Sequence, residues 1–184
     1  MKRFAAGIIT LVGLTVLGGQ IPDAYAHVQL APQDAMKASR QDIDDIVAFY
    51  GKIEDALAKK DLNAIMTFYT DDYFHQGITK SQIRGLWENL FGNFDSLNST
   101  HVFNGVEIKE GEAIITCTGT LLGIPKTAKD KKYVTVDKWV NMDHYLSKKG
   151  GSWRIVGGAS HWLIEPMVKH GKEIKYQVEF HPLF

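Results

Sequence analysis

From residue 39 onward, the first half of the chain carries apolar side chains at helical spacing. The first stripe consists of positions three and four residues apart: Ile43, Ile46, Val47, Tyr50, Ile53 and Leu57. This period predicts a helix of about five turns that buries one face. Ser39 stands just before the segment, and its hydroxyl is suited to accept a hydrogen bond from a backbone N–H of the first turn.

Two shorter helices are predicted next. Asp61 is placed to cap the first, whose apolar positions are Ala64, Ile65, Phe68 and Tyr69. Thr79 with Gln82 three residues later forms a capping box and opens the second. The apolar stripe of that helix comprises Ile83, Leu86, Trp87, Leu90 and Phe91. Tyr73-Phe74-His75, between these helices, is expected to form a short strand, and residues 92–98 a loop.

The hydrophobic period changes to two from His101 onward. Four segments alternate or run apolar at strand length: 101–109, 113–122, 133–146 and 152–163. Lys148-Lys149-Gly150-Gly151 has the composition of a hairpin loop between the last two. Because the helices precede the strands, we predict an α+β domain with the helices on one face of a mostly antiparallel sheet.

The first 26 residues have the three parts of a secretory signal peptide. A basic start precedes an uncharged apolar stretch, and Ala24-Tyr25-Ala26 has the small-x-small form of a cleavage site. The stretch from Phe4 to Gly19 is shorter than the ~20 residues of a membrane-spanning helix. We therefore expect a periplasmic or secreted protein that begins at His27 and has no membrane partner after cleavage. An uncleaved membrane anchor is the alternative.

The remaining chain divides into three parts. Residues 27–38 show no clear period and are expected to form an extended lead-in. Residues 39–164 form the predicted domain. Residues 165–184 are a C-terminal extension in which apolar and polar positions alternate from Ile174 to Phe180, which predicts one more half-buried strand.

Composition narrows the function classes. The 184 residues include 21 Lys+Arg and 21 Asp+Glu, so no basic footprint for nucleic acid is expected. The single cysteine, Cys117, excludes an intramolecular disulfide and a zinc site built on several thiolates. We predict no cofactor.

The segment from Tyr50 to Gly77 resembles the opening of the nuclear transport factor 2-like superfamily. That group includes ketosteroid isomerases, scytalone dehydratase, limonene epoxide hydrolase and SnoaL-like polyketide cyclases. The resemblance lies in a helix that ends in Lys-Asp-Leu, a helix that ends in Phe-Tyr-x-Asp-Asp, and a short strand after it. Trp153-Arg154-Ile155-Val156, after the Gly-rich hairpin, resembles the usual last strand, so that the likeness covers residues 40–163.

The resemblance implies a cone-shaped α+β barrel. Three N-terminal helices would pack on a strongly curved, mixed, mostly antiparallel sheet, with a pocket inside the cone. Homodimers that form through the outer face of the sheet are common in the superfamily. The fold hosts many activities and many proteins without enzymatic activity, so the resemblance implies a fold more strongly than a function.

Two of the three catalytic groups of the ketosteroid isomerases have no counterpart here. The position of the carboxylate base is Gly77, and that of the oxyanion tyrosine is Ile53. The third group, a carboxylic acid in an Asp-His-Phe run, resembles Asp143 in Asp143-His144-Tyr145. A buried, neutral Asp can donate a hydrogen bond. Asp143 alone does not make an isomerase, so that activity is disfavoured.

Pocket residues can still be proposed from strand alternation. If Asp143 points inward, Asp137, Trp139 and Asn141 share its face. The opposite face then carries Val136, Val140 and Met142, which suit a dimer surface. The candidates for ligand contact are Tyr69, Trp87, Phe91, Trp139, Asn141 and Trp162. Simple core packing is the alternative for the aromatic members of this set.

Acid–base chemistry is the sharpest catalytic hypothesis. His75, Asp143 and Tyr50 are its candidate residues, since a His paired with an Asp can act as a general base near neutral pH. In the alternative, His75 is partly exposed and Asp143 is fixed by backbone donors.

No metal site is predicted from histidine spacing, because no two histidines stand four residues apart as on a zinc-binding helix. Cleavage after Ala26 would, however, place an amine and an imidazole on His27, and such a pair can chelate Cu(II). In the alternative, the histidine at position 27 is there by coincidence and binds no copper.

Two function classes therefore remain. The first is a secreted protein that binds a small apolar or amphipathic molecule, or a protein partner. The second is a lyase, cyclase or hydrolase that uses His75, Tyr50 and Asp143. A structural dimer with a filled cone is a third reading.

Overall fold

The computed structural model describes residues 28–32, 35–75 and 77–158. Within them the predicted helices are α1 (Arg40–Ala58), α2 (Leu62–Thr67) and α3 (Lys80–Asn93). The hydroxyl of Ser39 accepts a hydrogen bond from the Asp42 backbone N–H, and Asp61 caps α2 in the same way. The predicted capping box begins α3.

The strands are β1 (Gln29–Leu30), β2 (Met36–Lys37), β3 (Phe74–His75), β4 (Ile78–Thr79), β5 (Phe94–Lys109), β6 (Glu112–Pro125), β7 (Val134–Lys149) and β8 (Ser152–Ile155). The main sheet has the order β1-β5-β6-β7-β8, and β2 also pairs with β5. The strands β5 to β8 are antiparallel, whereas β1 and β2 run parallel to β5. A separate hairpin joins β3 and β4.

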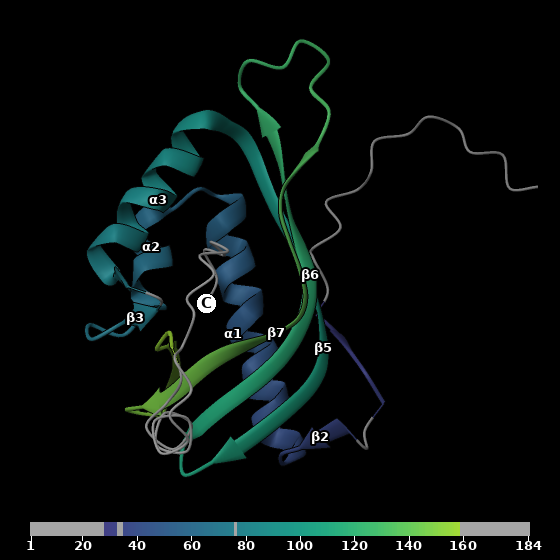
Figure 1. Cartoon of the computed structure of the whole chain (residues 1–184), viewed down its shortest axis with the longest axis vertical. Helices are drawn as coiled ribbons and strands as arrows, with labels where there is room; N and C mark the ends of the chain where they lie inside the picture. Colours follow the sequence, from purple (N-terminus) through teal and green to yellow (C-terminus); the bar gives the residue numbers. More distant parts are fainter. Residues whose placement is uncertain (1–27, 33–34, 76, 159–184) are drawn as a thin grey trace, which may run out of the picture.

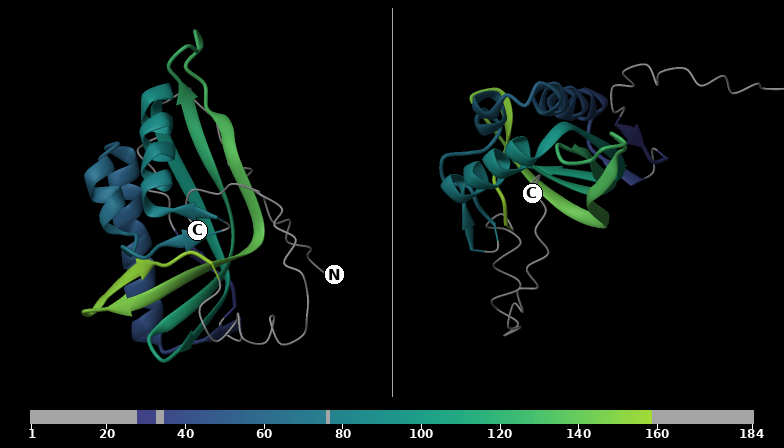
Figure 2. Two further views of the ribbon diagram at one scale, coloured as in Figure 1. Left: turned by 60° about the vertical axis from the view of Figure 1, so that its left-hand side comes forward. Right: turned by 90° about the horizontal axis from the view of Figure 1, so that it is seen from above.

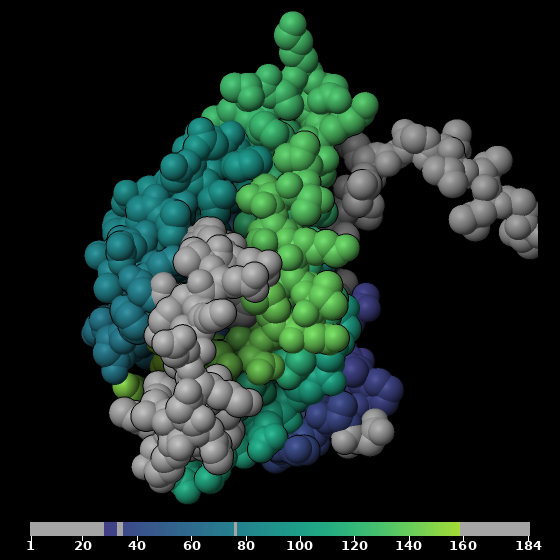
Figure 3. All heavy atoms as spheres, viewed as in Figure 1, coloured from purple at the N-terminus to yellow at the C-terminus, as the bar shows by residue number. Residues whose placement is uncertain are grey.

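The helices cover one face of this curved sheet (Figure 1). The sheet curls until β8 meets the corner after α2, where the Thr70 N–H donates to the Ile155 carbonyl at 3.0 Å. Figure 2 shows the same enclosure from above. The predicted α+β class and the cone-like arrangement of helices on a curved, mostly antiparallel sheet are confirmed. At one end of the molecule the loop of residues 126–133 stands out beyond α3 (Figure 3).

The strand β5 begins earlier than predicted. Residues 94–98 were expected in a loop, but the chain becomes extended at Phe94, directly after the last residue of α3. Asp95, Ser96 and Asn98 lie on exposed or half-buried positions, while Leu97 is buried. The alternation is therefore present, but polar side chains on the outer positions conceal it. The lead-in also gains structure, as β1 and β2 cover the free edge of β5.

Two β-bulges reverse the side-chain alternation in the middle of the sheet. One lies in β5 between Phe103 and Gly105, and the other lies in β7 between Trp139 and Met142. An extra residue in one strand moves the following side chains to the opposite face and bends the strand. Asn141, in the β7 bulge, has a positive φ of 52°. Asparagine tolerates this left-handed conformation better than most residues.

The β7 bulge corrects the predicted face assignment. Trp139 is buried as expected, but Asn141 and Asp143 are exposed on the outer face, and His144 is fully buried in the position expected for Asp143. Met142 packs against the core instead of lying on the outer face. Val140 does face outward, with 59% of its surface exposed.

Several predictions concern residues outside the described part of the chain. These are the signal peptide, His27, Trp162 and the C-terminal extension. Among the described residues, no helix is both long and apolar enough to cross a membrane.

Candidate functional site

Ionisable side chains from one helix and three adjacent strands meet on the inner face of the sheet. We call them the inner cluster: Tyr50, Glu54, His101, Cys117 and His144. Tyr50 and Glu54 stand one helical turn apart on α1, so that both point in the same direction. The other three come from β5, β6 and β7, which are neighbours in the sheet.

Tyr50 and His144 form the shortest polar contact of the cluster. The Tyr50 hydroxyl lies 2.8 Å from Nδ1 of His144, and both residues are fully buried. Burial raises the pKa of Tyr50 well above its ordinary value, so the phenol keeps its proton. When that proton is donated to Nδ1, the neutral imidazole carries its own proton on Nε2. The contact therefore orients His144 and favours one tautomer.

Glu54 and His101 form a second pair. Oε1 of Glu54 lies 3.9 Å from Nε2 of His101, whose side chain is fully buried, while the Glu54 side chain keeps 10% of its surface exposed. Burial, with a smaller contribution from the charge of Asp55, raises the pKa of Glu54 to about 8. At pH 7 the Glu54 carboxyl group is therefore protonated in most molecules. A pKa this close to neutral pH suits a group that exchanges protons.

The thiol of Cys117 is held in the same place but is not activated. The Trp139 indole N–H donates to its sulfur at 3.3 Å, and Nδ1 of His101 lies 3.6 Å from that sulfur. Burial raises the pKa of Cys117 to about 11, so it is a neutral thiol at pH 7. Because the thiolate is the nucleophile, Cys117 is a packing and hydrogen-bonding residue here.

The indole of Trp139 reaches the cluster because position 119 is glycine. A Cβ atom at Gly119 would lie 2.4 Å from Cζ2 of Trp139 and 2.1 Å from the Thr100 carbonyl oxygen. The ring centroid of Trp139 lies 5.3 Å from the ring centroid of His101 and 6.2 Å from that of His144. Trp139 thus forms an aromatic wall beside both imidazoles.

The structure places three of the other predicted ligand contacts in the core near the helices. The Trp87 indole N–H donates to the Tyr69 hydroxyl at 2.9 Å, and the Trp87 and Phe91 rings are 5.6 Å apart. Tyr69 and Trp87 are buried, and Phe91 is half-buried. Their packing roles are visible, and ligand contact by these residues stays a prediction.

His75 and Asp143 lie outside the inner cluster. Asp143 is exposed and accepts a hydrogen bond from the Thr116 hydroxyl at 2.7 Å, so its expected inward orientation is wrong. The bulge at Asn141 is the physical reason. His75 lies on β3, where its Nδ1 accepts a hydrogen bond from the Gly158 N–H at 2.8 Å. Tyr50 is the one proposed catalytic residue that the structure places in the cluster.

Glu54, His101 and His144 are the site residues that sequence reasoning missed. Glu54 follows Tyr50 by four positions, so its charge falls on the apolar stripe of α1, and this was a usable signal. His101 lies two residues before the buried Phe103, in phase with it, which was a second signal. No such signal exists for His144, because its orientation depends on the bulge.

No group of three or more His, Cys, Asp or Glu residues in the described ranges is arranged to hold a metal ion.

Comparisons with known proteins agree on the fold. No protein-family model and no curated protein matches the sequence. Solved structures do match: a candidate aromatic ring hydroxylase from Novosphingobium aromaticivorans superposes with a TM-score of 0.53 at 18% identity, over 65% of this chain and 87% of that one. A candidate dehydratase of the nuclear transport factor 2-like family from Streptomyces avermitilis gives 0.50 at 12% identity, over 64% and 92%. The chain has the nuclear transport factor 2-like fold.

A candidate scytalone dehydratase from Novosphingobium aromaticivorans matches this fold as well. Its TM-score is 0.53 at 9% identity, over 64% of this chain and 80% of that one. Structural similarity at identities this low establishes the fold alone. The chemistry must be inferred from the residues of each chain. In this chain, the inner cluster lies where α1 meets the sheet.

Proposed function

We propose that the protein binds a small apolar or amphipathic molecule on the inner side of the cone and carries out acid–base chemistry on it with the inner cluster. The main support for this function is that Glu54, His101, Tyr50 and His144 converge in the interior of the protein. Perturbed titration of a buried carboxyl group beside a histidine is typical of acid–base sites.

The division of roles follows from the chemistry of each group. Ionised Glu54 would take a proton from a carbon next to a carbonyl group, with His101 adjacent to stabilise the charge. Nε2–H of His144, oriented by Tyr50, would donate a hydrogen bond to the departing hydroxyl group, and protonated Glu54 would return the abstracted proton to it. Loss of that proton and of the hydroxyl group yields an alkene and water, and both side chains regain their starting protonation states. This is a lyase reaction of the dehydratase type.

The names of the structural neighbours support this class. The neighbours include a candidate dehydratase and a candidate scytalone dehydratase. The missing isomerase groups at Gly77 and Ile53 direct the proposal away from ketosteroid isomerisation. Glu54 replaces His75 and Asp143 as the acid–base candidate, with His144 as the hydrogen-bond donor beside it.

Binding without turnover is the second candidate function. It is favoured by the full burial of His101 and His144, which leaves Glu54 as the member of the cluster with some exposure. A binding protein would use the same groups to recognise a polar end of its ligand. Turnover separates the two functions.

Hydrogen–deuterium exchange into carbon acids provides the test. The full chain is incubated in D₂O with a panel of cyclic ketones, and loss of the α-proton signals is followed by NMR. We expect exchange above the buffer rate, and we expect Glu54→Gln to remove it. Asp55→Asn, which neutralises the adjacent exposed carboxylate, should retain it. Exchange that is equal in Glu54→Gln and the unaltered protein would refute catalysis by Glu54.

A homodimer and a periplasmic or secreted location complete the proposal. The exposed Val134 and Val140 on β7 support association through the outer face of the sheet. Native mass spectrometry of the protein exported by its own N-terminal segment reads the mature N-terminus, the oligomeric state and any retained ligand or copper at His27.

A further inference from the structure

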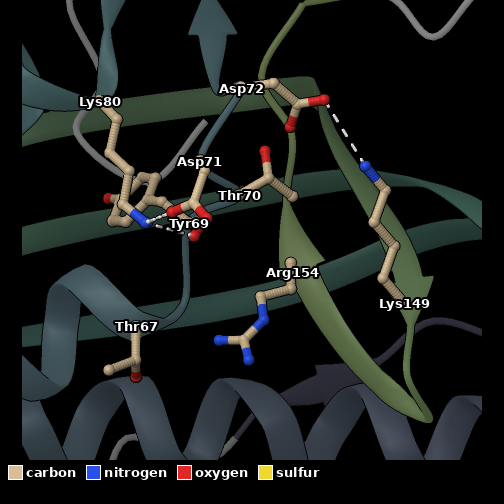
Figure 4. Close-up of a pocket in the computed structure, with 8 residues that line it drawn as sticks. All are labelled: Thr67, Tyr69, Thr70, Asp71, Asp72, Lys80, Lys149 and Arg154. Atoms are coloured by element: carbon tan, nitrogen blue, oxygen red, sulfur yellow. Dashed lines mark hydrogen bonds and ion pairs between the residues drawn. The ribbon is translucent and has the colours of Figure 1, made fainter.

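A pocket lies on the outside of the cone, where β8 meets the corner between α2 and β3 (Figure 4). It has a volume of about 550 Å³. Its lining is polar and mostly charged: Thr67, Tyr69, Thr70, Asp71, Asp72, Lys80, Lys149 and Arg154. The inner cluster contributes no residue to it, so this inference does not depend on the proposed function.

Both carboxylates of the pocket already have cationic partners. Lys80 Nζ lies 2.8 Å from Asp71 and 3.0 Å from the Tyr69 carbonyl oxygen, and Lys149 Nζ lies 3.5 Å from Asp72. The hydrogen bond from Lys80 holds the pKa of Asp71 below its ordinary value. Both lysines are therefore engaged, and the two pairs form opposite sides of the pocket (Figure 4).

Arg154 is the third cation that lines the pocket. Trp153 and Ile155, its neighbours on β8, are buried in the core, so strand alternation directs Arg154 to the outer side. Its side chain points into the pocket, and no carboxylate among residues 28–32, 35–75 and 77–158 lies within ion-pair distance of its guanidinium (Figure 4). The charge of Arg154 still acts on Asp71, whose pKa it helps to lower.

A half-buried guanidinium with no acceptor in the described part of the chain is an unfavourable arrangement, because burial removes part of its hydration. The fork of donors on an arginine matches the two oxygens of a carboxylate, and such bidentate hydrogen bonds are among the strong ones in proteins. We propose that this pocket binds a small organic carboxylate, held through its two oxygens by Arg154.

The charge of the pocket favours a monoanion. Three cations and two carboxylates leave one positive charge, which one ligand carboxylate would neutralise. A phosphate dianion would bring excess negative charge close to Asp71 and Asp72. Repulsion between like charges at this distance is substantial where solvent screening is incomplete.

Titration by NMR tests the proposal with acetate as the probe. The ¹⁵N-labelled full chain is titrated with sodium acetate at an ionic strength held constant with sodium chloride. We expect saturable shifts of the Arg154 Nε–H signal and of the Thr70 amide. Loss of a charge-assisted hydrogen-bond pair predicts that Arg154→Gln weakens acetate binding about tenfold or more. Arg154→Lys keeps the charge and removes the fork of donors. Its affinity for acetate should lie between those of the unaltered protein and Arg154→Gln.

Arg40→Gln is the matched control, because Arg40 pairs with Asp44 on the surface of α1 and does not line the pocket. This variant should bind acetate like the unaltered protein. Shifts that do not saturate, or that saturate at the Thr70 amide with unchanged affinity in Arg154→Gln, would overturn the proposal. Tighter binding of dianionic phosphate than of acetate would overturn the assignment of a carboxylate.

Discussion

The hydroxyl group of Tyr50 lies 2.8 Å from Nδ1 of His144, which links α1 to β7 inside the protein. Ninety-four positions separate the two residues in sequence. A buried imidazole whose nitrogen lost this partner would have an unsatisfied polar atom in a site with little water. The contact therefore both stabilises the fold and sets the orientation of a proposed hydrogen-bond donor.

Tyr50→Phe should lower the free energy of unfolding by about 1–3 kcal/mol, since it removes one partner of a buried hydrogen bond. Denaturant unfolding measures the loss. Long-range ¹H–¹⁵N NMR spectra should show a change in the tautomer populations of His144. Tyr145→Phe is the control, because Tyr145 follows His144 on β7 and lies on the outer side of that strand. An unchanged His144 tautomer in Tyr50→Phe would contradict the assigned role.

Glu54→Gln should make the protein more stable at pH 8. The pKa of Glu54 is raised to about 8 in the folded protein, from an ordinary value near 4.5. Between these values the folded state holds a proton that the unfolded state releases, so this group lowers stability as pH rises. Gln removes the penalty, and we expect a gain of roughly 2 kcal/mol or more at pH 8 that disappears below about pH 4.5.

Urea unfolding at several pH values measures this difference. Asp55→Asn is the control: the neighbouring carboxylate is exposed and makes only the smaller contribution to the raised pKa of Glu54, so its loss should leave most of the pH dependence in place. A stability difference between Glu54→Gln and the unaltered protein that is independent of pH would show that Glu54 titrates normally.

Gly119→Ala should disrupt the wall formed by Trp139. The added Cβ would lie 2.4 Å from the Trp139 ring and 2.1 Å from the Thr100 carbonyl oxygen, and neither backbone nor indole can yield freely in the core. Overpacking of this kind costs about 1–3 kcal/mol. Gly85→Ala, on α3 with no atom within 4 Å of the added Cβ, should be neutral or stabilising. Equal unfolding midpoints for both variants would contradict the described packing.

The bulge at Asn141 should be sensitive to the backbone conformation of its residue. Its φ of 52° suits glycine and asparagine and strains a β-branched side chain. Asn141→Val should therefore destabilise the protein by about 1–3 kcal/mol, while Asn141→Gly should cost less. Because this bulge directs His144 inward, the Val variant should also perturb the His144 NMR signals. A stable Asn141→Val protein with unchanged His144 signals would refute this relationship.

The sequence contained enough information to predict the helices and the fold class. Ser39, Asp61 and the Thr79–Gln82 capping box are local signals, and each acts where it was expected. The inner and outer faces of β7 could not be predicted, because strict alternation fails at a bulge. Asn141 is the residue that marks this bulge, but an asparagine within an apolar strand does not by itself reveal a positive φ.

The candidate site was predictable only in part. Tyr50 lay on a helical stripe and was correctly directed inward, whereas Asp143 was placed one residue out of phase. His101 and His144 approach each other, with ring centroids 6.3 Å apart, through pairing of distant strands. The raised pKa of Glu54 depends on burial that the whole fold creates. Neither relationship is encoded in a local motif.

Glu54 is, in the mechanism that we propose, a proton-carrying carboxyl group beside His101. A ¹³C NMR titration of the Glu54 side-chain carboxyl in the full chain tests it most directly, with Glu54→Gln used to assign the signal. We expect a titration midpoint near pH 8 and a coupled change in the His101 ring signals. A midpoint near 4.5, the ordinary value for glutamate, would contradict it.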